Sequence, residues 1–149
     1  MNTEPVGQRI PYYLVIDPGH ATGWATFDRS GNGITMGTCK NRQHVYDLLQ
    51  KTRPETIIME DWVSREKTTF GGDRMETIRV IGAVEFYCHI RQIPLHEQPN
   101  TVKPVAYKYA GLEYKKGPKS ASHEKDAYAH GVYYLQRAGV RRPQQGRAT

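Results

Sequence analysis

The chain has 149 residues, of which 38% are hydrophobic, and it carries a formal net charge of +6 with a pI of about 9.4. This length suits one domain with a real hydrophobic core, and no apolar run approaches the roughly 18 residues of a transmembrane helix. The first residues lack the layout of a signal peptide, and two distant cysteines are typical of free thiols in a reducing cytoplasm.

The excess positive charge is concentrated in two segments. Five lysines and one acid lie within Lys103–Lys119, and four arginines with no acid lie between Arg137 and the C-terminus. Such clusters are typical of surfaces that bind a polyanion, although an ordinary solvated surface fits equally well. Three tyrosines alternate with the lysines, which suits either stacking on exposed bases or core packing. These are Tyr107, Tyr109 and Tyr114.

The N-terminal part is predicted to form three antiparallel strands. Residues 1–10 are expected to be a flexible leader. Tyr12–Asp17 is an apolar run typical of a buried strand, and Gly23–Asp28 and Ile34–Cys39 follow as the second and third strands, with turn-forming residues between them. A helix capped by Asn41 is then expected to run to about residue 52.

The next part alternates strands and helices. Thr56–Trp62 is an apolar strand that ends in carboxylates, and Ile93–Gln98 is a short fifth strand that Pro94 places near a sheet edge. A long helix over Asp73–Gln92, with its first residue as the cap, lies between them. Apolar residues surround much of this helix, so we expect it to be well buried, with Gly82 packed on the sheet.

Asn100–Ala110 is predicted to be a short helix, Gly111–Ser120 a basic linker, and Ser122–Arg137 the last helix. Residues 139–149 are basic and rich in proline and glutamine, so we expect a disordered tail. The folded domain is expected to span residues 11–138. This order of elements predicts an α/β fold with a five-stranded mixed sheet, in which three antiparallel strands precede two parallel ones, flanked by helices.

Candidate catalytic groups stand at three places in this order of elements. Asp17 ends the first strand, and Glu60 ends the fourth, followed by Asp61 on the opposite face. His123 and Asp126 share one face at the start of the last helix. Each group alone has an ordinary explanation, such as turn hydrogen bonds for the first and a helix cap or surface pair for the last two. Their combination in this order indicates one site.

The chemistry of this set suits divalent metal ions. Three carboxylates and an imidazole can hold two cations about 3.5–4 Å apart, an arrangement that hydrolyses phosphodiesters. Carboxylate oxygens favour Mg²⁺, whereas an imidazole favours a softer ion such as Mn²⁺. The helix dipole disfavours protonation of His123, which leaves its imidazole able to coordinate a metal or relay a proton.

The ordered motifs resemble those of the ribonuclease H-like nucleases, and within them most closely the RuvC-type Holliday junction resolvases. The matching segments are Ile16-Asp17-Pro18-Gly19, Ile57-Ile58-Met59-Glu60, Gly82 in the long helix, Pro99-x-x-Val102-Lys103 and His123-x-x-Asp126-Ala127. The similarity covers most of the chain. It implies Mg²⁺-dependent cleavage of branched DNA such as the four-way junction, with Mn²⁺ also supporting activity, by a homodimer that uses the long helix in its interface. The catalytic residues and metal ligands that it implies are Asp17, Glu60, His123 and Asp126.

The resemblance also implies DNA contacts outside the metal site. Resolvases of this type carry an aromatic wedge in the loop after the fourth strand, and Phe70 stands there, with a local hydrophobic plug as the alternative. Some of these resolvases have aspartate where this chain has His123, a difference that affects metal preference. The basic residues expected to contact DNA, unless they are merely solvated, are Lys103, Lys108, Lys115, Lys116 and Lys119.

Other interpretations of the sequence stay open. His130, one turn beyond Asp126, fits a solvated or core histidine, or a residue behind the metal ligands. An actin-like or sugar-kinase-like ATPase also has Asp-x-Gly after its first strand, but 149 residues leave no room for its second domain. A nuclease acting on RNA or RNA–DNA hybrids and a catalytically silent junction-binding protein fit the same motifs. We expect a cytoplasmic enzyme of a bacterium or a phage-infected host.

Overall fold

In a computed structural model of the chain, residues 10–61, 72–115 and 122–143 are described. A five-stranded sheet with the order β3-β2-β1-β4-β5 forms the centre. Its strands are β1 (Tyr13–Asp17), β2 (Thr22–Phe27), β3 (Gly33–Cys39), β4 (Thr56–Asp61) and β5 (Leu95–Pro99). The first three are antiparallel, and β4 and β5 run parallel to β1. The predicted mixed sheet and the edge position of the fifth strand are confirmed.

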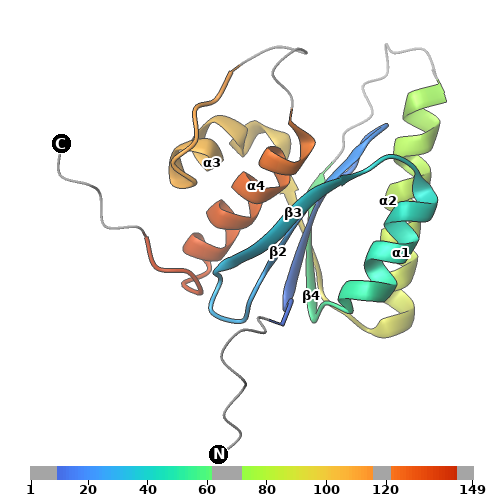
Figure 1. The fold of residues 1–149 in the computed structure, drawn as a ribbon, viewed down its shortest axis with the longest axis horizontal. Helices are drawn as coiled ribbons and strands as arrows, with labels where there is room; N and C mark the ends of the chain where they lie inside the picture. The colour runs from blue at the N-terminus through green and yellow to red at the C-terminus, as the bar shows by residue number, and fades with distance from the viewer. Residues whose placement is uncertain (1–9, 62–71, 116–121, 144–149) are drawn as a thin grey trace, which may run out of the picture.

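Helices cover both faces of this sheet (Figure 1). They are α1 (Arg42–Thr52), α2 (Gly72–Arg91), α3 (Lys103–Tyr109) and α4 (His123–Arg137), with a short 3₁₀ turn, η1 (Asn100–Val102), before α3. In Figure 1, α1 and α2 lie on one face and α3 and α4 on the other. Among the described residues, no helix is long and apolar enough to cross a membrane.

The central strand β1 joins two hydrophobic cores. Leu14 and Ile16 pack with residues of α1 and α2, whereas Val15 packs with residues of α4. Successive side chains on a strand point to opposite faces, so the three fully buried residues of this run serve both layers. Burying each of them contributes about 1.5–3 kcal/mol. Asp17 lies two residues after Val15, so the same alternation directs its side chain toward the α4 side.

Side-chain caps begin two of the helices, and one of them is the predicted cap Asn41. The Asn41 side chain accepts a hydrogen bond from the His44 amide at 3.0 Å, and Ser122 Oγ accepts one from the Lys125 amide at 3.4 Å. Each satisfies an amide that has no partner within its own helix. Cys39 and Cys88 are buried free thiols, as expected.

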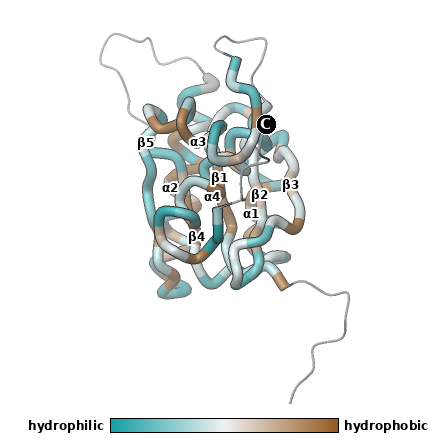
Figure 2. Tube along the Cα trace, turned by 90° about the vertical axis from the view of Figure 1, so that its left-hand side faces the viewer, coloured by the Kyte–Doolittle hydropathy of each residue, from teal (hydrophilic) through white to brown (hydrophobic). Residues whose placement is uncertain are grey.

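The long helix α2 differs from the prediction. It begins at Gly72, so Asp73 lies within the helix and not at its cap. Hydrophobic and polar residues are mixed along it (Figure 2), and Phe86 and Ile90 are 64% and 59% exposed. Gly82 faces outward, because a Cβ there would meet nothing within 4 Å. The expectation of a well-buried helix is therefore wrong, since the sheet covers only one side of it.

The start of the predicted tail is also folded. Val140 packs against the core on the α4 side, and Arg141 Nη1 donates a hydrogen bond to the Gly31 carbonyl at 2.9 Å. Packed and hydrogen-bonded residues therefore extend beyond residue 138, because Val140 reaches the core and Arg141 reaches the turn between β2 and β3. Residues 1–9 and 144–149, which include most of the predicted leader and tail, lie outside the described residues.

Candidate active site

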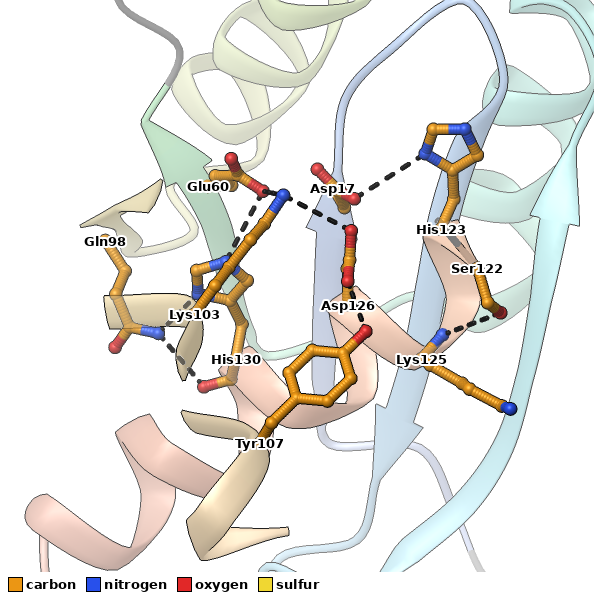
Figure 3. A network of polar contacts seen from close by, with 10 residues as sticks. All are labelled: Asp17, Glu60, Gln98, Lys103, Tyr107, Ser122, His123, Lys125, Asp126 and His130. Atoms are coloured by element: carbon orange, nitrogen blue, oxygen red, sulfur yellow. Dashed lines mark hydrogen bonds and ion pairs between the residues drawn. The ribbon is translucent and has the colours of Figure 1, made fainter. Parts of the chain in front are cut away.

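Three elements bring carboxylates together at one end of the sheet. Asp17 ends β1, Glu60 is the last residue but one of β4, and Asp126 lies in the first turn of α4. The parallel register pairs Ile16 with Met59, so the next residues along, Asp17 and Glu60, lie side by side. All three carboxylates are buried and point toward one another (Figure 3). The predicted acidic set therefore converges, while Asp61 faces the opposite side of the sheet by strand alternation.

A close approach between β2 and α4 completes this arrangement. Gly23 pairs with Asp17 across the antiparallel ladder. A Cβ at Gly23 would overlap the backbone carbonyl of His123 and lie 2.7 Å from the Glu124 amide nitrogen. Only glycine lets the first turn of α4 come this close to β2. Gly23 in β2 thus determines how closely the helix can place His123 and Asp126 beside Asp17.

Lys103 lies between two of the carboxylates. Its Nζ is 3.3 Å from Glu60 Oε2 and 3.2 Å from Asp126 Oδ2, and its side chain is 22% exposed. Burial alone would lower the pKa of this ammonium, but Asp17, Glu60 and Asp126 together raise it. Lys103 therefore stays charged and neutralises part of the cluster. The sequence predicted a DNA contact at this position, and the structure places the ammonium among the acidic groups.

His123 stands at the rim of the cluster. Its Nδ1 lies 3.7 Å from Asp17 Oδ2, and its side chain is 39% exposed. This separation is too long for a hydrogen bond, so the imidazole is close to the carboxylate without being held by it. The position leaves one ring nitrogen directed at the acidic cluster (Figure 3).

The pKa values of the two strand carboxylates are shifted in opposite directions. Burial, and then the contact with Glu60, raise the pKa of Asp17 well above its ordinary value. Burial would raise the pKa of Glu60 as well, but contacts with His130, Asp17 and Lys103 outweigh it and lower that pKa to about 2. Two adjacent carboxylates avoid carrying full charge together. When the pair carries a single proton, these opposite shifts place it on Asp17 and leave the negative charge on Glu60.

Three further polar residues support these carboxylates from behind. The Tyr107 hydroxyl donates a hydrogen bond to Asp126 Oδ1. His130 Nε2 lies 3.3 Å from Glu60 Oε2, and Gln98 contacts the other ring nitrogen. The sequence left open whether Tyr107 stacks on bases or packs in the core, and the structure shows it buried. Of the alternatives for His130, the structure supports a buried residue that contacts Glu60 from the side away from the other carboxylates.

A sequence signal for two of these residues existed in the spacing. His130 follows Asp126 by four residues on α4, and Tyr107 follows Lys103 by four on α3, so each pair shares one helical face. Gln98 carries a weaker signal, because only the pairing of β5 with β4 places it beside Glu60.

Comparison with known proteins identifies the fold. No family model and no curated protein sequence matches the chain. Solved structures do match. A Thermus thermophilus RuvC in complex with a Holliday junction substrate is 17% identical, with 86% of this chain and 96% of that chain covered and a TM-score of 0.58. A second T. thermophilus RuvC structure matches with the same identity and coverage and a TM-score of 0.55. The chain has a RuvC-like fold. The predicted fold class is thereby confirmed.

Basic and aromatic residues, together with Glu113, are exposed on α3 and in the segment that follows it. Lys108 on α3 and Lys115 after it are exposed, as are Tyr109 and Tyr114. Tyr114 packs edge-on against Tyr107, with ring centroids 5.2 Å apart. Because Tyr107 also donates a hydrogen bond to Asp126, it connects exposed Tyr114 to the acidic cluster. Three of the predicted DNA contacts, namely Phe70, Lys116 and Lys119, lie outside the described residues.

The donor chemistry of the carboxylate cluster fits a divalent cation. Three carboxylates and an imidazole face a single ammonium, so the buried space carries excess negative charge. Within residues 10–61, 72–115 and 122–143, no three such side chains are already placed to hold a metal ion. The Lys103 ammonium lies between Glu60 and Asp126, where a cation shared by these two carboxylates would compete with it.

Lys103→Met is expected to destabilise the metal-free protein by roughly 3 kcal/mol, because it leaves buried carboxylates without their counter-charge. Mg²⁺ should restore more stability to this variant than to the wild type, since a cation can then neutralise the same groups. Urea unfolding with and without Mg²⁺ measures both effects. Lys108→Met, which removes an exposed lysine from the same helix, is the control. Equal losses in the two variants would contradict the neutralising role of Lys103.

Proposed function

We propose that this protein is a divalent-metal-dependent endonuclease that resolves Holliday junctions and other branched DNA by paired phosphodiester cleavage. The observation that carries the proposal is the convergence of Asp17, Glu60 and Asp126 at the end of the sheet, with His123 at the rim. The likeness in fold to a RuvC in complex with a Holliday junction substrate supports the choice of DNA structure. Such an enzyme would act in the cytoplasm of a bacterium or of a phage-infected host.

In this proposal, Asp17, Glu60, His123 and Asp126 hold Mg²⁺, with Mn²⁺ as a substitute. Bound divalent cations would supply an activated water and stabilise the leaving oxygen of the phosphodiester. Asp17 must give up its proton to act as a ligand, so cation binding should strengthen as pH rises through its raised pKa. Once turned away from the carboxylates, Lys103 is suited to contact a backbone phosphate.

The basic and aromatic surface beside the site is proposed to bind the branched DNA. Lys108 and Lys115 would contact phosphates, and exposed Tyr109 and Tyr114 offer aromatic faces to unpaired bases. Phe70, Lys116 and Lys119 are proposed as further contacts on the basis of the sequence. The net charge of +6 would strengthen association with a polyanion.

The exposed apolar side of α2 is proposed to form a homodimer interface. Met75, Ile78, Phe86 and Ile90 are exposed hydrophobic residues on this helix. Gly82 presents no side chain on the same helix, which allows a second helix to approach closely. Paired cuts on two strands require two active sites, and a two-fold dimer supplies them.

Phe86→Lys is expected to weaken dimerisation by at least about 2 kcal/mol, or roughly 30-fold, because it places a charge in the apolar interface. Sedimentation of the purified protein should shift from dimer to monomer, and paired cuts should become single nicks. Val105→Lys, which alters an exposed hydrophobic residue on α3, should remain dimeric. An unchanged dimer in the Phe86 variant would exclude α2 as the interface.

A panel of labelled substrates tests the proposed function. Wild-type protein is incubated with a four-way junction, a flap, a duplex of matched sequence and an RNA–DNA hybrid, each with Mg²⁺ or with chelator. We expect metal-dependent paired nicks near the branch point of the junction. Preferred cutting of the hybrid would instead indicate a nuclease that acts on RNA–DNA hybrids. Tight junction binding without cutting in Mg²⁺ or Mn²⁺ would indicate a silent binding protein.

A further inference from the structure

A buried histidine and a buried glutamine form a polar chain behind Glu60. Gln98 on β5 pairs in register with Glu60 on β4, and His130 lies on α4 one turn beyond Asp126. His130 is only 1% exposed, and Gln98 is also buried. The contacts run from Gln98 to His130 and from His130 to Glu60 (Figure 3). Neither residue belongs to the proposed ligand set.

The direction of the first hydrogen bond follows from the His130 backbone carbonyl. This oxygen can only accept, and Gln98 Nε2 lies 3.1 Å from it, so the amide nitrogen and not the amide oxygen occupies this position. The same nitrogen lies 2.7 Å from His130 Nδ1. Because an amide nitrogen donates and does not accept, Nδ1 must be the acceptor. The ring nitrogen that faces Gln98 therefore carries no proton.

This arrangement determines the tautomer of the ring. An imidazole without a proton on Nδ1 is neutral and carries its proton on Nε2. His130 Nε2 points toward Glu60 Oε2 at 3.3 Å. Both atoms are buried, and among the described residues neither has a hydrogen-bond partner of good geometry. A small turn of the carboxylate would satisfy both, and buried polar groups are rarely left unpaired.

His130 differs from Lys103 because its N–H donor is uncharged. Both contact Glu60 Oε2, but the Lys103 ammonium competes with an incoming cation for the same carboxylates. A neutral N–H can hold one carboxylate oxygen while the other oxygen stays available to a metal. Donors of this kind, placed behind a ligand, commonly change metal affinity by about 10–100-fold.

We propose that His130, fixed by Gln98 as the neutral Nε2–H tautomer, is a positioning residue that orients the Glu60 carboxylate for cation binding. The role rests on the proposed metal site, whereas the tautomer does not. Gln98 acts one step further back, by keeping the His130 proton on the nitrogen that faces Glu60.

Proton–nitrogen correlation NMR of the metal-free protein tests the tautomer. We expect the His130 ring to show a protonated Nε2 and an unprotonated Nδ1 at neutral pH. Gln98→Leu removes the amide donor and should abolish this preference while leaving His130 in place. A protonated Nδ1 in the wild type, or an unchanged tautomer in the Gln98 variant, would overturn the assignment.

Calorimetric titration with Mn²⁺ tests the positioning role. His130→Leu fills the space without a donor and should weaken Mn²⁺ binding by about 10-fold or more. His130→Gln places an amide nitrogen near the position of Nε2 and should recover most of the affinity, with thermal unfolding used to verify that both variants fold. Wild-type affinity in His130→Leu would overturn the positioning role alone. A wild type that binds no Mn²⁺ would overturn the proposed function and this role together, whereas the NMR result would still decide the tautomer.

Discussion

Asp17→Asn is expected to stabilise the metal-free protein at neutral pH and to abolish cleavage. Burial and the contact with Glu60 raise the pKa of Asp17 above the value it has in the unfolded chain. Stability therefore falls as pH rises from the unfolded pKa through the folded one, because the unfolded state loses this proton more easily. A neutral amide of the same shape removes that cost. It also removes a charge that the proposed cation needs, so catalysis and stability oppose each other at this position.

Glu60→Gln is the matched control, with an expected effect of the opposite sign. Burial would raise the pKa of Glu60, but its polar contacts lower it to about 2, so ionised Glu60 contributes stability that is lost as pH falls from the unfolded pKa toward 2. Each pKa unit corresponds to about 1.4 kcal/mol, and each kcal/mol moves the Tm by about 2–4 °C in a protein of this size. Thermal unfolding at pH 7 with chelator should therefore show a higher Tm for Asp17→Asn and a lower Tm for Glu60→Gln. Shifts of the same sign would contradict the assignment of the proton to Asp17.

The other large effect is expected for Gly23→Ala. The added Cβ would overlap the His123 carbonyl and crowd the Glu124 amide, which are backbone atoms that cannot rotate aside. The first turn of α4 must then move away from β2 and carry Asp126 away from Asp17. We expect a loss of roughly 3 kcal/mol in stability. Cleavage should fall by about 100-fold, since a displacement of about 1 Å is enough for such a loss.

Gly37→Ala is the control for this variant. Gly37 lies in the same antiparallel strands as Gly23, but its added Cβ would meet the Trp24 ring, which is a side chain that can adjust. None of the three atoms nearest to this Cβ belongs to α4. Urea unfolding and cleavage of a four-way junction compare the two variants. We expect the Gly37 variant to lose stability without a comparable loss of cleavage. Wild-type cleavage by Gly23→Ala would show that the close approach of β2 and α4 does not determine the position of the ligands.

The sheet and the three acidic residues of the site could be predicted because each depends on local patterns. An apolar run that ends in a carboxylate indicates both the strand and the end at which the acid lies, as for Asp17 and Glu60. Ser122 and the spacing of His123 and Asp126 likewise indicate a helix start within a few residues. These signals do not depend on distant parts of the chain.

The surroundings of the site could not be predicted, because they depend on distances between separate elements. A lysine that neutralises carboxylates and a lysine that contacts DNA look alike in sequence, so the place of Lys103 between Glu60 and Asp126 could not be predicted. The outer side of α2 was misjudged for a similar reason, since apolar residues such as Phe86 have the same pattern whether they face a core or a surface. The tautomer of His130 depends on Gln98, which is brought near only by the pairing of β4 and β5.

Cleavage of an end-labelled four-way junction by wild type and Asp17→Asn, side by side, tests the catalytic assignment most directly. Binding of the same junction is measured in parallel, so that a loss of cutting can be separated from a loss of DNA affinity. In Mg²⁺, the wild type should make paired nicks near the branch point, and Asp17→Asn should bind the junction without cutting it. Cutting that persists in Asp17→Asn, or a wild type that cuts without any divalent metal, would contradict a metal-dependent centre built on Asp17.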